Sequence, residues 1–94
     1  MPSVIATLKV RQDKVDEAKA LFAKLASQVS QAEPGTLAYV PHQRKDEPTT
    51  FVFYEKYASD EDFQTHGANL RKVGAEFAGV MAGPPEIVFL EEIS

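Results

Sequence analysis

The order of strand-like and helix-like patterns limits the fold of this 94-residue chain more than any other feature. Alternating apolar residues, typical of strands, occupy residues 4–10, 36–43, 50–57 and 86–93. After the first and third of these segments, apolar residues recur every three or four positions, as in amphipathic helices. The predicted order is strand, helix, strand, strand, helix, strand. It is typical of an α+β, ferredoxin-like βαββαβ fold with a four-stranded antiparallel sheet, and the length suits a single domain over 1–94.

Both predicted helices have identifiable ends. Asp13 is expected to cap the first helix, which ends before Pro34 and Gly35. Ser59 is expected to cap the second, since acidic residues follow it in the first turn. The glycines in the second helix predict a break near 67–69. The inward stripes are Val15, Ala18, Phe22, Leu25 and Val29 in the first helix, and Phe63, His66, Leu70, Val73, Phe77 and Val80 in the second.

The two faces of the predicted sheet differ in what should cover them. In the third strand, Phe51, Phe53, Glu55 and Tyr57 share the face predicted to pack on the helices, and in the second strand Leu37 and Tyr39 share one face. The opposite face is contiguous and apolar, which favours a homodimer through this open face. Its predicted members are Ile5, Val40, Val52, Tyr54, Val88 and Leu90.

The composition of the chain argues against several classes of partner and cofactor. The net charge is -4 and the basic residues are scattered, so nucleic acid is not expected. There is no cysteine, and the two histidines, His42 and His66, fall on opposite sheet faces, so neither a metal nor another cofactor is expected. No apolar run is long enough to span a membrane and no signal peptide is evident, so the expected location is the cytoplasm.

His66 and Glu55 are the candidate catalytic residues. His66 replaces an apolar residue in the inward stripe of the second helix, and imidazole can accept a proton near neutral pH. Glu55 is the single charge in an aromatic row and needs a polar partner, for which His66, Tyr39 and Tyr57 are candidates. A structural Glu–His or Glu–Tyr hydrogen bond is the alternative. Candidate substrate-binding aromatics are Tyr39, Phe53, Tyr57, Phe63 and Phe77, which could equally be core residues.

Four segments of the chain resemble the antibiotic biosynthesis monooxygenase family. They are Glu-Pro-Gly-Thr-Leu-Ala-Tyr at 33–39, Phe-Val-Phe-Tyr-Glu-Lys-Tyr at 51–57, Phe-Gln-Thr-His at 63–66 and Gly-Pro-Pro-Glu at 83–86. The resemblance covers nearly the whole chain. It implies a dimeric α+β barrel with a pocket between helices and sheet in each subunit.

The same resemblance implies several possible activities, because related proteins include cofactor-free quinol or anthrone monooxygenases, haem-degrading enzymes and a sugar-phosphate isomerase. The haem-degrading branch uses an asparagine, a tryptophan and a histidine at places that here hold Ala6 or Thr7, Tyr57 and Gly74. Haem degradation is therefore disfavoured. The best-known anthrone oxidases depend on a tryptophan and an asparagine, and this chain has no tryptophan.

The leading hypothesis is a cofactor-independent monooxygenase that acts on a quinol or polycyclic phenol. Such chemistry needs a base and a dry apolar pocket, because the deprotonated substrate supplies the electrons. The alternatives are a base-mediated isomerase of the same fold and a non-catalytic dimer that binds a small ligand.

Overall fold

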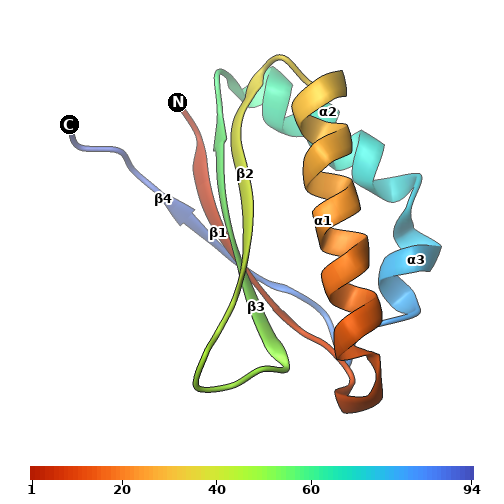
Figure 1. Cartoon of the computed structure of the whole chain (residues 1–94). Helices are drawn as coiled ribbons and strands as arrows, with labels where there is room; N and C mark the ends of the chain where they lie inside the picture. Colours follow the sequence, from red (N-terminus) through yellow and green to blue (C-terminus); the bar gives the residue numbers. More distant parts are fainter.

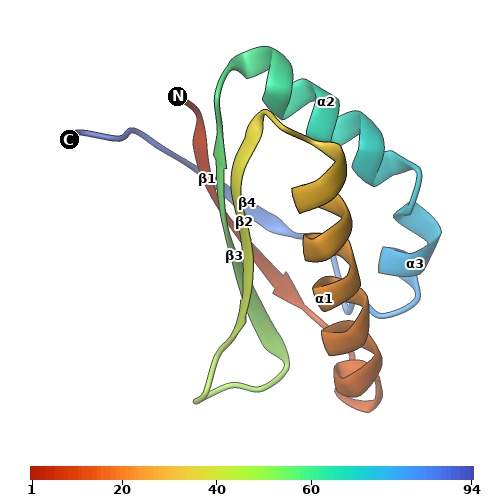
Figure 2. The same ribbon diagram turned by 45° about the horizontal axis from the view of Figure 1, so that its top comes forward.

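A computed structural model of the chain describes all 94 residues and confirms the predicted order of elements. A four-stranded antiparallel sheet in the order β2-β3-β1-β4 carries all the helices on one face (Figures 1 and 2). The elements are β1 (Ser3–Lys9), a 3-10 turn (Gln12–Lys14), α1 (Val15–Ala32), β2 (Thr36–Gln43), β3 (Thr50–Tyr57), α2 (Asp60–Arg71), α3 (Gly74–Ala78) and β4 (Glu86–Leu90).

The core lies between α1 and the two central strands, as the apolar patterns predict. Phe22 of α1 is 1% exposed, and its ring meets the rings of Phe51 and Phe53 edge-on at centroid distances of 5.1 and 5.0 Å. Burying a side chain of this size contributes about 1.5–3 kcal/mol. This packing therefore fixes the position of α1 on the central strands.

Two predicted helix boundaries are wrong. Asp13 caps nothing, because the 3-10 turn delays α1 until Val15, and no side chain caps its start. The predicted break in the second helix is present, but it lies at residues 72–73, between α2 and α3, and not at 67–69. α2 continues to Arg71, and the backbone N–H groups of Lys72 and Val73 then bond carbonyls three residues back and close the helix. A glycine within a helix costs only about 1 kcal/mol, and inward packing around Gly67 outweighs that cost. Ser59 does cap α2, accepting from the backbone N–H of Asp62.

Two strand predictions also need correction. The pairing of β2 with β3 shifts between Thr36 and Ala38, so Leu37 is an extra residue that turns outward and is 51% exposed instead of sharing a face with Tyr39. The final strand ends at Leu90, not at residue 93. Leu90 pairs with Ser3, where β1 begins, so the residues beyond it have no partner strand.

The open face of the sheet has the predicted composition. Ile5 lies opposite Tyr54 on one side and Val88 on the other, and Val40 lies opposite Tyr54, so these side chains share one face. Val40, Tyr54, Val88 and Leu90 are each 36% to 44% exposed. None of the helices combines the length and apolar character needed to cross a membrane.

Candidate functional site

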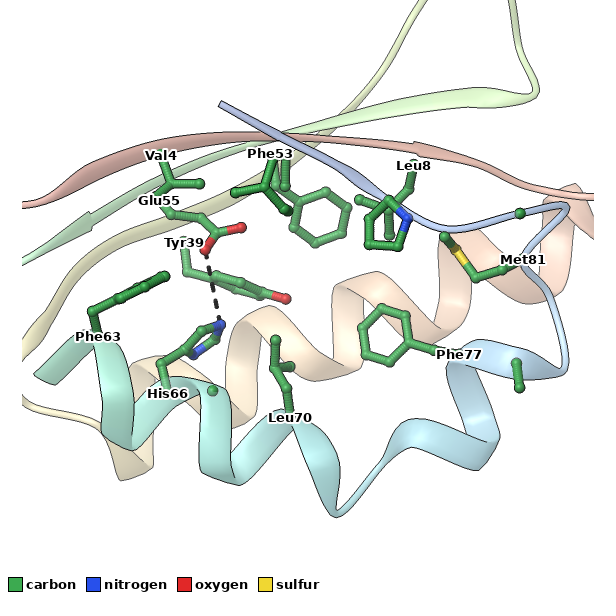
Figure 3. Close-up of a pocket in the computed structure, with 16 residues that line it drawn as sticks. Val4, Leu8, Tyr39, Phe53, Glu55, Phe63, His66, Leu70, Phe77 and Met81 are labelled. Carbon is green, nitrogen blue, oxygen red and sulfur yellow. Dashed lines mark ion pairs between the residues drawn. The ribbon is translucent and has the colours of Figure 1, made fainter. Parts of the chain in front are cut away.

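A cavity of about 460 Å³ lies between the sheet and the helical layer (Figure 3). All four strands contribute to one wall, and α2, α3 and the segment leading to β4 form the other. Of the 16 lining residues 11 are hydrophobic, so a ligand here would be largely removed from water. Of the predicted site residues, those that line the cavity are Tyr39, Phe53, Glu55, Phe63, His66 and Phe77.

His66 and Glu55 face each other at one end of this cavity. His66 lies on the inward side of α2 and is 1% exposed, and Glu55 projects from β3 and is 7% exposed. The distance from His66 Nε2 to Glu55 Oε1 is 3.9 Å, which exceeds a hydrogen bond (Figure 3). Nε2 is buried and has no hydrogen-bond partner in the protein. An unpaired polar atom buried beside a cavity calls for an explanation, and a ligand that reached it would supply the missing partner.

The other imidazole nitrogen is bound by Glu33, a residue that the sequence analysis did not select. Glu33 directly follows α1, and its Oε1 lies 2.8 Å from His66 Nδ1. Thr36 donates to the same oxygen at 2.8 Å, and Asn69 donates to Oε2 at 3.1 Å. Thr36 follows Glu33 by three residues across a turn, and Asn69 follows His66 by three on one helix face. The i, i+3 spacing within a helix predicts that His66 and Asn69 lie on one face, but no local pattern in the sequence predicts that either residue contacts Glu33.

The two glutamates that flank His66 differ in protonation. Burial alone would raise the pKa of the Glu33 carboxyl, but hydrogen bonds from Thr36, His66 and Asn69 hold that pKa below its ordinary 4.5. Burial raises the pKa of Glu55 above 4.5, and its hydrogen bond from Tyr57 and the nearby His66 offset this only in part. Glu33 is therefore ionised at neutral pH, while Glu55 takes up a proton more readily than an ordinary glutamate.

Tyr57 lies behind Glu55 and does not line the cavity, unlike the other predicted aromatics. It is fully buried, and its hydroxyl donates to Glu55 Oε1 at 2.5 Å. Burial, followed by the nearby Glu55, raises the pKa of the Tyr39 hydroxyl, and burial with the hydrogen bond to Glu55 does the same for Tyr57. Both remain neutral phenols. Tyr57 thus orients Glu55, whereas Tyr39 lies at the cavity wall.

His42 is far from this arrangement, on the opposite face of the sheet, as expected. It lies opposite Val52 on the open face and is exposed. Its Nδ1 lies 3.0 Å from the Val40 carbonyl oxygen. His42 therefore serves as an internal reference for a histidine outside the cavity.

Fold and cavity together define a class: small α+β proteins that enclose an apolar pocket with a histidine in its wall. The profile of one family, antibiotic biosynthesis monooxygenase, matches residues 1–70. The chain belongs to the antibiotic biosynthesis monooxygenase family. No match was found among curated proteins.

Solved structures agree with this assignment. A Caulobacter crescentus protein assigned to the antibiotic biosynthesis monooxygenases is 35% identical, with a TM-score of 0.90 over 99% of this chain and 90% of that one. A Nitrosomonas europaea protein with the same assignment is 29% identical, with a TM-score of 0.84 over the full length of both chains. Rv0793 of Mycobacterium tuberculosis is 21% identical with a TM-score of 0.86 over 99% of this chain and 95% of that one, a likeness of fold.

Proposed function

We propose that this protein is a cofactor-independent monooxygenase that oxidises a quinol or polycyclic phenol. The observation that carries the proposal is the buried, unpaired Nε2 of His66, a residue that lines the apolar cavity. A general base must reach the proton that it removes, and it works best where water is excluded. The family assignment and the names of the Caulobacter and Nitrosomonas proteins support monooxygenation as the reaction class.

In the proposed reaction, Nε2 of His66 removes the proton of a substrate hydroxyl. The resulting electron-rich anion reduces O2, and one oxygen atom forms a new bond to ring carbon while the other leaves as water. For a simple quinol the balance is quinol plus O2 giving hydroxyquinone plus water, so the substrate supplies all the electrons and the His66 proton returns to the departing oxygen. The protein supplies a base, an orientation and a dry site.

Glu55 is proposed to hold the substrate hydroxyl in place beside His66. A ligand oxygen about 2.7–3.0 Å from both Nε2 and Glu55 Oε1 would bridge their 3.9 Å separation, and because Nε2 is fully buried we propose that the neighbouring side chains shift to admit it. A protonated Glu55 would donate to that oxygen and stabilise the anion as it forms. Tyr39, Phe53, Phe63 and Phe77 are proposed to contact the ring system.

The cavity lining supports an apolar substrate over a phosphorylated one. No lysine or arginine lines the cavity, and its titratable side chains are Tyr39, Glu55 and His66. A phosphate would enter this space without a cation to receive it and would meet Glu55. A sugar-phosphate isomerisation is therefore a poorer fit than oxidation of a neutral aromatic.

Oxygen uptake tests the proposed activity. Native protein, His66→Ala and His42→Ala are each mixed with a panel of quinols and anthrones. We expect native protein and His42→Ala to consume O2 at equal rates and His66→Ala to lose about 100-fold or more, since a positioned base contributes about 10²–10⁴-fold. Equal rates for native protein and His66→Ala would refute the role of His66. Ligand binding without O2 uptake by any of the three would favour a binding module.

We also propose that two copies associate through the open sheet face. Contiguous exposed apolar surface of this kind is rare on isolated subunits. Sedimentation should give twice the 10.4 kDa mass of one chain. Tyr54→Glu, on that face, should sediment as a monomer, whereas Ala20→Glu, at an exposed position of α1, should remain dimeric. A native monomer at high concentration would refute the proposal.

A further inference from the structure

We propose that Glu33 is a positioning residue that holds the His66 proton on Nδ1 and so keeps the unprotonated Nε2 toward the cavity. The catalytic consequence rests on the proposed function, whereas the placement of the proton does not. The inference starts from the geometry around Nδ1, where Glu33 Oε1 lies 2.8 Å away and both groups are buried.

The Glu33 carboxylate is held in place by more than His66. Thr36 donates to Oε1 and Asn69 donates to Oε2, so both oxygens are engaged and the group cannot rotate away from the imidazole. An ionised carboxylate has no proton to donate. The hydrogen bond to His66 therefore requires the proton to reside on Nδ1. A neutral imidazole carries one N–H, which leaves a lone pair on Nε2.

The opposite tautomer has no support from the surroundings of the ring. The ionisable groups that face the imidazole are Glu33 from the turn after α1, Tyr39 from β2, and Glu55 and Tyr57 from β3. Tyr57 is committed to Glu55, and Glu55 is too far from Nε2 for a hydrogen bond. A proton on Nε2 would thus lack a partner and would turn the Nδ1 lone pair against the Glu33 carboxylate.

This arrangement separates two tasks between two glutamates. Glu33 does not line the cavity, so it acts on a ligand only through the imidazole of His66. Glu55 lines the cavity and meets the ligand directly. For metal-bound histidines, removing an orienting group on the far nitrogen typically costs about 10–100-fold in activity, and we expect a loss of similar size for His66.

Nitrogen NMR of the two imidazoles tests the inference without any substrate. The protein contains two histidines, so a His42→Gln variant assigns both signals. We expect native His66 to carry its proton on Nδ1 at neutral pH. Glu33→Gln should lose that preference, because an amide can donate to Nδ1 as readily as accept from it. The matched change Glu55→Gln, on the other side of the same ring, should leave the proton on Nδ1, as should Thr36→Val, which keeps the carboxylate.

The native spectrum alone can overturn the inference, even if Glu33→Gln fails to fold: a His66 proton on Nε2 would refute it. A folded Glu33→Gln that keeps the native tautomer would refute it as well. If the tautomer moves as expected, kcat for a quinol substrate should fall about 10–100-fold in Glu33→Gln with little change in KM. An expected tautomer in a native protein that oxidises no substrate would remove the proposed function and leave the positioning role of Glu33 standing.

Discussion

The two sides of the His66 imidazole present the same kind of side chain in opposite electrostatic settings. Glu33 and Glu55 are both 7% exposed. Glu33 receives hydrogen bonds from three residues, whereas Glu55 receives one, from Tyr57. The pKa of Glu33 is lowered and that of Glu55 is raised, burial being the largest single influence on both.

The difference shows that the supply of hydrogen-bond donors and the depth of the carboxyl group in the protein together set the charge of a carboxylate that has little exposed surface. Three donors compensate Glu33 for lost hydration, and one is not enough for Glu55. Around one histidine, the result is a permanent anion on one side and a readily protonated acid on the other. Acid and base roles in enzymes are commonly assigned in this way, by environments that push two pKa values apart.

The strongest test of this contrast replaces each glutamate in turn by glutamine, and it is expected to give the largest change in stability. At pH 7, Glu33→Gln should lower the free energy of unfolding by about 1–3 kcal/mol, because it replaces charge-assisted hydrogen bonds and turns an amide N–H₂ toward the donors. Glu55→Gln should raise it by about 1 kcal/mol at most, since the amide oxygen still accepts from Tyr57 and no buried charge remains. Urea denaturation measures both changes.

Glu61→Gln, an exposed position in α2, controls for the loss of one carboxylate from the surface. Its free energy of unfolding should stay within about 0.5 kcal/mol of native. Equal destabilisation by Glu33→Gln and Glu55→Gln would mean that both carboxylates are equally well compensated, and the comparison would then fail.

The role of Glu33 could not be predicted from the sequence. Strand alternation and helical spacing act over a few residues, which is why they placed Phe53, Glu55 and His66 toward the interior correctly. The Glu33 site instead combines three separate segments: the turn after α1, the start of β2 and α2. A glutamate before Pro-Gly looks like a solvent-exposed helix end, and only the packing of α2 over that end buries it.

The remaining errors have the same origin in tertiary context. Tyr57 shares the strand face of Phe53 and Glu55, yet it lies beyond the cavity because α2 begins directly after β3 and covers it. The strand after α3 ends at Leu90 because β1 offers no residue to pair with beyond Ser3. Periodicity gives the face on which a side chain lies, but the limits of a cavity or a strand depend on what the neighbouring segment covers.

The pH dependence of stability is a smaller effect that tests the same contrast between Glu33 and Glu55. The folded-state pKa of Glu33 lies below its ordinary 4.5, so its contribution to stability is present above pH 4.5 and is lost as pH falls through the lowered value. The folded-state pKa of Glu55 lies above 4.5, so its contribution is present below pH 4.5 and is lost as pH rises through the raised value. The two variants should therefore diverge from native protein in opposite directions as pH rises.

Denaturation midpoints of native protein, Glu33→Gln and Glu55→Gln, measured in steps from pH 4 to pH 7, test these signs. Towards pH 4, Glu55 is protonated in both folded and unfolded chains, and Glu55→Gln should then match native protein. As pH rises the stability advantage of Glu55→Gln should emerge, while the deficit of Glu33→Gln should widen from its smallest value in acid. A stability advantage of Glu55→Gln that persists unchanged at pH 4 would show that packing, and not charge, distinguishes the glutamine from the glutamate. The electrostatic contrast between the two sides of His66 would then be refuted.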